Sequence, residues 1–139
     1  MIPVPQRIVA PFGASPPGDC MRCCVASIFE MPYEAVPHFA ESGDCIAAMN
    51  DWLRAIGIPL RAFDFEYPES STVEEFVESA DLWWWIGVVR SALFKGTTHG
   101  VVMHGSDVAY DPTPIHPVRP YRFIGGIVFV ATNPVVVIR

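Results

Sequence analysis

The spacing of apolar residues changes about halfway along this chain, from the period of a helix to that of a strand. Apolar residues recur at helical spacing behind Asp19 as far as Ile28, and the same spacing returns between Asp44 and Ile56. From Ile58 onward the sequence is mainly typical of strands separated by turns. This order favours an α+β fold, with N-terminal helices packed on a C-terminal antiparallel β-sheet, over a doubly wound parallel sheet.

The expected elements have recognisable boundaries. Asp19 is expected to cap the first helix, which should end near Glu30 because Pro32 disfavours a helical residue before it. Asp44 is expected to cap the second helix, and Gly57 to end it. The core-facing residues of the second helix should be Ile46, Met49, Leu53 and Ile56. Strands are expected at 58–67, 82–89, 99–104, 108–110, 121–131 and 135–138, and a short helix after a capping box of Ser71 and Glu74.

The composition indicates one globular domain. A chain of 139 residues fits a single domain, 1–139, because single cores commonly hold about 100 to 150 residues. Hydrophobic residues make up 51% of the chain and charged residues only 17%, so it can bury a proper core.

The net charge and the search for targeting segments limit the classes of partner that we expect for this chain. The net charge of -6 disfavours nucleic acid, which requires clustered Lys and Arg. The N-terminus lacks the basic start and apolar run of a secretory signal, and no stretch reaches the roughly 18 to 20 apolar residues of a membrane span. We therefore expect a cytoplasmic protein with no membrane partner.

Cys20 is the leading candidate for a reactive group. It falls in the first turn of the first expected helix, where unpaired N–H groups and the helix dipole favour a thiolate. A free thiol titrates near about 8.5, so the helix end and an imidazolium together could ionise it at neutral pH. The neighbouring Asp19 opposes this unless its side chain turns away into capping bonds. Cysteine is often buried, so a purely structural role stays open.

His99 and Asp111 could supply a base and the acid that orients it. Strand side chains alternate between faces, so these two residues share a face only if the turn between their strands holds an odd number of residues. The turn Gly105-Ser106-Asp107 supplies three. Val101 then lies opposite Asp111, with His99 on the diagonal, roughly 7 to 8 Å away. His104 points to the opposite face as the weaker candidate, and a satisfied core histidine remains the alternative role of His99.

The remaining cysteines have simpler interpretations. Cys24 lies on the apolar stripe of the helix and is expected in the core, while Cys23 points about 100° away from it. With Cys20 and either Cys45 or His38 they could form a zinc site, but zinc ligands usually come as two spaced pairs. We therefore expect no metal and no cofactor. Because no export signal is visible, reduced thiols are expected rather than disulfides.

An acyl-transfer site also needs hydrogen-bond donors for the oxyanion. The backbone N–H of Cys20 and a side-chain amide would supply them. Gln6 is the upstream amide available, across a proline-rich loop from Cys20. An exposed glutamine is the simpler interpretation from spacing alone.

Three of these segments resemble motifs of the papain-like cysteine peptidases. Segment 19–28, with Cys20 and Cys24, resembles the Asp-Cys-Gly-Pro-Thr-Cys helix start of that family, although Met21 stands where glycine is usual. Segment 99–102 resembles its His-x-Val-Val element, and 110–112 resembles its Asp-Pro element. The closest resemblance is to the bacteriocin-processing peptidase branch and to small uncharacterised phage and bacterial relatives.

The resemblance implies a papain-like fold with four site residues: nucleophile Cys20, base His99, orienting acid Asp111 and oxyanion residue Gln6. The leading hypothesis is a thiol hydrolase, that is, a peptidase, isopeptidase or amidase acting on a peptide or protein substrate through an acyl-enzyme. The alternative is a noncatalytic binding protein on the same scaffold, such as a phage effector that blocks a host protein. Both stay open because a fold does not settle a reaction.

Overall fold

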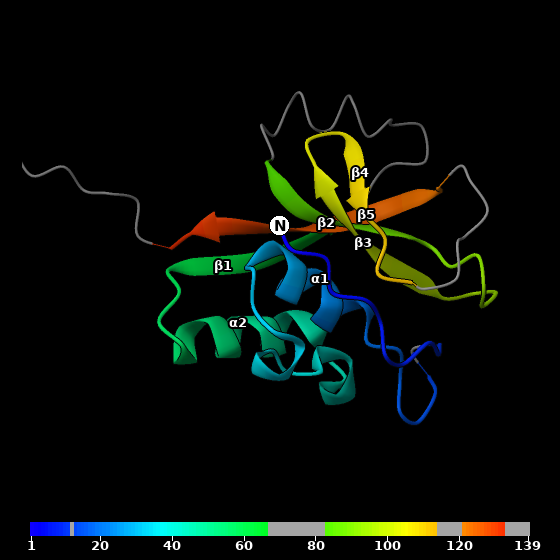
Figure 1. Cartoon of the computed structure of the whole chain (residues 1–139), viewed down its shortest axis with the longest axis horizontal. Helices are drawn as coiled ribbons and strands as arrows, with labels where there is room; N and C mark the ends of the chain where they lie inside the picture. Colours follow the sequence, from blue (N-terminus) through cyan, green and yellow to red (C-terminus); the bar gives the residue numbers. More distant parts are fainter. Residues whose placement is uncertain (12, 67–82, 114–120, 133–139) are drawn as a thin grey trace, which may run out of the picture.

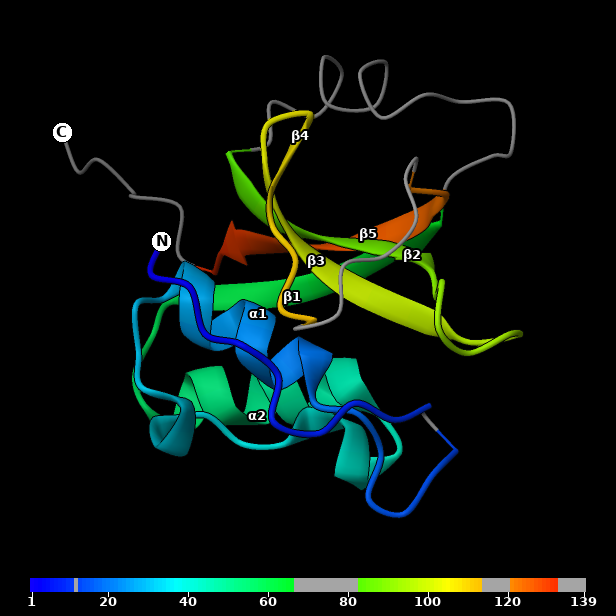
Figure 2. The same cartoon turned by 45° about the vertical axis from the view of Figure 1, so that its right-hand side comes forward.

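The computed structural model describes residues 1–11, 13–66, 83–113 and 121–132. These residues form helices that lie against one face of an antiparallel sheet (Figures 1 and 2). Two α-helices, α1 (Cys20–Ile28) and α2 (Cys45–Ala55), flank the 3-10 turns η1 (Tyr33–Ala35) and η2 (Phe39–Ser42). The strands are β1 (Leu60–Glu66), β2 (Trp84–Arg90), β3 (Thr98–His104), β4 (Asp107–Tyr110) and β5 (Phe123–Ala131).

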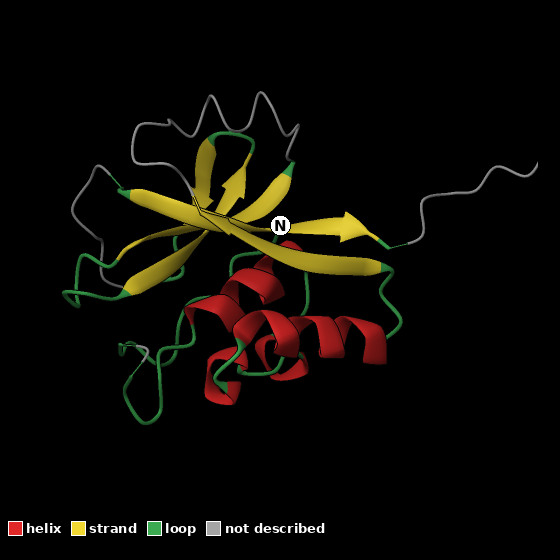
Figure 3. Cartoon of the chain, turned by 180° about the vertical axis from the view of Figure 1, so that it is seen from behind, coloured by secondary structure: helices red, strands yellow, loops and turns green. Residues whose placement is uncertain are grey.

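The sheet has the strand order β1-β5-β2-β3-β4, and every neighbouring pair is antiparallel. Seen from behind, both α-helices remain on the same side of the sheet (Figure 3). The expected α+β class, with N-terminal helices and an antiparallel sheet, is confirmed. The helix expected after Ser71 and the strand expected at 135–138 lie outside the described residues.

Helix α1 begins at Cys20 as predicted, but the side chain of Asp19 does not cap it. The Asp19 carboxylate turns to the N-terminal segment, where it accepts hydrogen bonds from the backbone N–H groups of Arg7 (3.3 Å) and Ile8 (3.1 Å). It also accepts one from the Tyr33 hydroxyl, at 2.6 Å. The capping prediction is wrong because these three donors, distant in sequence, satisfy the carboxylate instead.

Helix α2 follows the sequence prediction more closely. The side chain of Asp44 caps it by accepting a hydrogen bond from a first-turn backbone N–H at 3.0 Å. Gly57, with a φ of 76°, provides the left-handed stop. Met49 and Leu53 are buried, but Ile56 is 44% exposed because the helix has already ended before it. Ile56 is therefore wrong as a core prediction.

Helix α1 packs closely on β3 because Gly100 has no side chain. A Cβ atom at Gly100 would come within 3.1 Å of the Met21 side chain. Met21 is itself buried, so it fills the space between helix and sheet. This packing brings the first turn of α1, with Cys20, close to the beginning of β3, which carries His99.

Candidate active site

A bulge in β4 sets the register that joins His99 to Asp111. The turn between β3 and β4 holds two residues, because His104 pairs with Asp107, so the predicted three-residue turn is wrong. Ala109 is an extra residue at the register shift that follows. The two turn residues and Ala109 together make three, and this odd number places His99 and Asp111 on the same face of the sheet. His99 Nε2 consequently lies 2.7 Å from Asp111 Oδ1.

The Asp111 carboxylate is held by two further donors. The backbone N–H of Thr113 donates to Oδ1 at 3.0 Å, and the Tyr121 hydroxyl donates to Oδ2 at 3.0 Å. Burial alone would raise the pKa of Asp111, but the hydrogen bonds from His99, Thr113 and Tyr121 outweigh it and lower the pKa. Asp111 thus stays ionised and fixed in orientation beside the imidazole.

His99 connects this carboxylate to Cys20. Burial on its own would lower the pKa of His99, but hydrogen bonds with Asp111 and Cys20, and the negative charge of both groups, raise it from 6.5 to about 9. Because Asp111 occupies Nε2, Nδ1 is the ring nitrogen left for Cys20. The structure therefore brings together the three residues that the sequence singles out.

The other three cysteines have neutral thiols, and two of them, Cys23 and Cys24, are buried. All four cysteines are free. Burial, with the negative charge of nearby groups adding to it, raises the pKa of Cys23 and Cys45 to about 12 and that of Cys24 well above its usual range. Across the described ranges, no three His, Cys, Asp or Glu side chains converge to share a metal ion. Cys20 is left as the candidate nucleophile.

Gln6 lies at the same site and is buried, so the interpretation as an exposed glutamine is wrong. Its backbone N–H donates to Pro112 O at 2.8 Å, and its side-chain Oε1 accepts from the Thr113 hydroxyl at 2.7 Å. Its Nε2 donates to Ile8 O at 3.1 Å, which uses one of the two amide hydrogens. The second hydrogen is available to a substrate oxygen.

Thr113 and Tyr121 are site residues that the sequence analysis missed. Thr113 lies two residues after Asp111, the spacing at which an aspartate accepts a local backbone hydrogen bond, so a signal for it existed. No comparable sequence signal marks Tyr121.

The remaining described histidines lie outside this arrangement. His104 stacks on the Trp84 ring with centroids 4.3 Å apart, as a packed strand histidine. His38 Nε2 lies 2.9 Å from Pro17 O in the loop before η2. Neither is hydrogen-bonded to Asp111, so His99 is the base candidate that the geometry supports.

The space around Cys20 is small. Gln6, Cys20 and His99 line a cavity of about 30 Å³, which has room for a water molecule but not for a peptide. One wall is the hairpin between β2 and β3, including Leu93 and Phe94. The hairpin therefore limits the space beside Cys20 in this structure.

Phe94→Ala should therefore speed the alkylation of Cys20 by iodoacetamide several-fold, because it removes the largest side chain of this wall. Rates would be followed by mass spectrometry of the Cys20 peptide. Phe63→Ala is the matched control, since Phe63 is an exposed aromatic residue on β1 and does not line the cavity. Equal rates in the wild type and Phe94→Ala would show that the hairpin does not restrict access.

The stability of the folded state should fall between pH 6.5 and about 9 because of His99. Its pKa is higher in the folded chain, so the imidazolium contribution is complete below pH 6.5 and is lost as the pH rises through about 9. We expect the free energy of unfolding, measured with urea, to fall by on the order of 2–3 kcal/mol over this interval.

His99→Gln should remove that part of the pH dependence. The thiols of Cys23, Cys24 and Cys45 add a further loss as the pH approaches their ordinary pKa, but this loss is the same in both proteins and cancels when their slopes are compared. An unchanged slope in His99→Gln would contradict the pairing of His99 with Asp111 and Cys20.

Comparisons with known proteins find no matching family model, no matching curated protein and no matching solved structure. Among the described residues, no helix has the length and apolar character needed to cross a membrane. Support for a function therefore comes from the geometry of the chain's own residues and from its motifs.

Proposed function

We propose that this chain is a thiol hydrolase with a papain-like fold, in which Cys20 attacks the carbonyl carbon of an amide in a peptide or protein. The observation that carries the proposal is the position of His99, which lies 2.7 Å from Asp111 and lines the same small cavity as Cys20 at the start of α1. The resemblance of segments 19–28, 99–102 and 110–112 to papain-like motifs adds support.

The first half of the reaction forms an acyl-enzyme. Before substrate binds, His99 already holds the proton of the Cys20 thiol, and the Asp111 carboxylate stabilises the resulting imidazolium. The thiolate adds to the carbonyl carbon, and the resulting oxyanion accepts hydrogen bonds from the backbone N–H of Cys20 and the free amide hydrogen of Gln6. The C–N bond then breaks, and His99 donates its proton to the leaving nitrogen.

The second half releases the acyl group. His99 takes a proton from a water molecule, whose oxygen attacks the thioester carbon. The C–S bond breaks, the carboxylic acid leaves, and Cys20 is released as a thiolate beside the protonated His99. No oxidant or cofactor is consumed, so the described residues suffice for each proton transfer.

A noncatalytic binding protein is the second candidate, and the small cavity favours it. A space of about 30 Å³ beside Cys20 does not admit a peptide in this closed arrangement. On this candidate, a phage effector that blocks a host protein would keep its biological task after Cys20→Ala. An effect that survives Cys20→Ala would therefore favour binding.

The experiment for the leading proposal is an unbiased cleavage assay. The protein is incubated with a mixed pool of internally quenched peptides, and fragments are sequenced by mass spectrometry. We expect cleavage by the wild type and none by Cys20→Ala or His99→Ala, with His104→Ala as the matched histidine control. Equal cleavage by wild type and Cys20→Ala would overturn the assignment of the nucleophile.

A further inference from the structure

Three cations of this acidic protein have no partner among the described residues. The chain carries a net charge of -6. Arg7 and Arg54 form ion pairs with carboxylates, and Arg22 and Arg61 lie over aromatic rings. The cations without an ion pair or ring contact in the described chain are Arg90, Lys95 and Arg122.

These free cations gather at one end of the sheet. Arg90 ends β2, Lys95 lies in the hairpin that follows, and Arg122 immediately precedes β5. The backbone N–H of Arg90 donates to Arg122 O at 3.0 Å, which fixes the two arginines as neighbours. This end also carries His99 near the start of β3.

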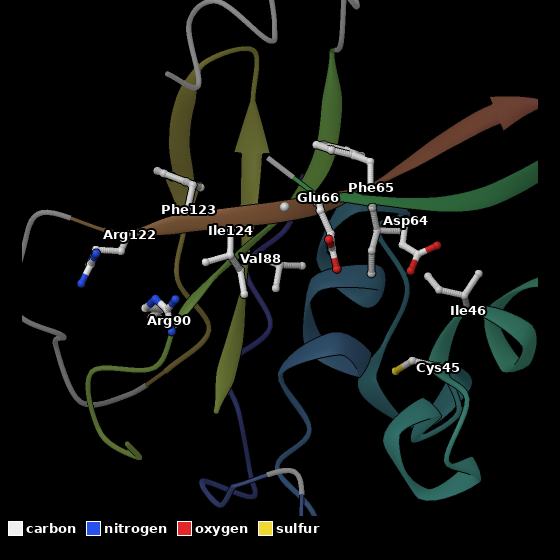
Figure 4. A pocket seen from close by; sticks show the side chains of 13 residues that line it. Cys45, Ile46, Asp64, Phe65, Glu66, Val88, Arg90, Arg122, Phe123 and Ile124 are labelled. Atoms are coloured by element: carbon white, nitrogen blue, oxygen red, sulfur yellow. The ribbon is translucent and has the colours of Figure 1, made fainter. Parts of the chain in front are cut away.

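The two arginines line a pocket of about 750 Å³, large enough for part of a peptide. Figure 4 shows Arg90 and Arg122 at one end of this pocket and Asp64 and Glu66 toward the other, with apolar side chains such as Val88 between them. Neither Asp64 nor Glu66 forms an ion pair within the described residues. The pocket is therefore divided by charge, and none of its charged side chains has an ion-pair partner in the part of the chain that the structure describes.

The pocket adjoins the candidate active site. Arg90 pairs with Thr98 across the β2–β3 ladder, and Thr98 lines the cavity around Cys20. Cys45 lines another side of the pocket. Cys45 is close enough to Cys20 for the negative charge of Cys20 to act with burial in raising the pKa of the Cys45 thiol. A peptide bound in the pocket would thus extend toward Cys20.

We propose that this pocket binds an acidic segment of the peptide substrate, with a carboxylate side chain held by Arg90 and Arg122. The inference rests on the proposed function, and it names the substrate class. Guanidinium groups bind carboxylates through paired, charge-assisted hydrogen bonds. Asp64 and Glu66 in the same pocket repel a polyanion such as nucleic acid, so a peptide with a single acidic side chain is the better fit.

The test is a selection for binding that needs no turnover. A pool of acetylated random decapeptides is passed over immobilised Cys20→Ala protein, and retained peptides are sequenced by mass spectrometry. We expect Asp or Glu to be enriched by about tenfold over Asn or Gln at one position. The double variant Arg90→Gln/Arg122→Gln should lose this enrichment, whereas Arg54→Gln, which removes one exposed charge outside the pocket, should keep it.

Both arginines are exposed, so the double variant should unfold at an unchanged temperature, which checks that the fold is intact. No enrichment of acidic peptides, or an enrichment that survives in the double variant, would overturn the inference. Its failure is distinguishable from that of the proposed function. Acidic peptides that bind but are never cleaved would refute the hydrolase and keep the ligand class. Cleavage of peptides with no preference for acidic residues would support the hydrolase and overturn the ligand class.

Discussion

His99→Ala should slow the alkylation of Cys20 by iodoacetamide at about pH 6 by roughly thirtyfold. In the proposed mechanism His99 holds the proton of Cys20, and Cys20 reacts as a thiolate. An ordinary thiol is only about 0.3% ionised at that pH, and the greater nucleophilicity of its thiolate recovers about tenfold of the loss. Mass spectrometry of the Cys20 peptide over time gives both rates.

The matched control for this prediction is His104→Ala. His104 lies on the same strand but stacks on Trp84, so its removal should leave the alkylation rate of Cys20 unchanged. The buried thiols of Cys23 and Cys24 serve as internal references, since they should remain unreactive in every variant. Equal rates at Cys20 with and without His99 would mean that no thiolate–imidazolium pair exists.

Asp19→Ala should destabilise the protein by about 3–5 kcal/mol, the largest effect on stability that we expect. The Asp19 carboxylate is fully buried and accepts hydrogen bonds from Arg7 N–H, Ile8 N–H and the Tyr33 hydroxyl. Truncation leaves these donors without their acceptor and opens a cavity beside Cys20. Urea unfolding at neutral pH measures the change.

Tyr33→Phe is the graded comparison for Asp19→Ala. It removes one of the three donors but leaves both backbone hydrogen bonds, so we expect a loss of about 1 kcal/mol. If Asp19→Ala cost no more than Tyr33→Phe, the two backbone hydrogen bonds would contribute nothing to stability. The N-terminal segment would then be held by other contacts.

Local signals were sufficient to predict where α1 and α2 start and in which order the described strands follow along the chain. Cys20 and Cys45 begin the two α-helices where the sequence places them. The pairing of His99 with Asp111 was also predictable, because the parity rule depends only on an odd number of intervening residues. The rule holds although that number arises from a turn and a bulge together.

Contacts between distant segments were not predictable in the same way. The hydrogen-bond donors to Asp19 lie before it on the N-terminal segment and after it at Tyr33, and no local sequence pattern predicts them. The bulge at Ala109 depends on how β3 and β4 adjust to each other, which spacing alone does not determine. Tyr121 reaches Asp111 only through the folded sheet, for the same reason.

The N-terminal segment is tied to both halves of the candidate site. Ile8 is held by Asp19, next to the nucleophile, whereas Gln6 is held by Pro112 and Thr113, next to the orienting acid. The contact between Gln6 and Thr113 closes a long loop, and the entropic cost of loop closure grows with loop length. During synthesis, Cys20 leaves the ribosome long before His99, Asp111 and the residues that hold Gln6 in place. A partly made chain therefore has no assembled triad.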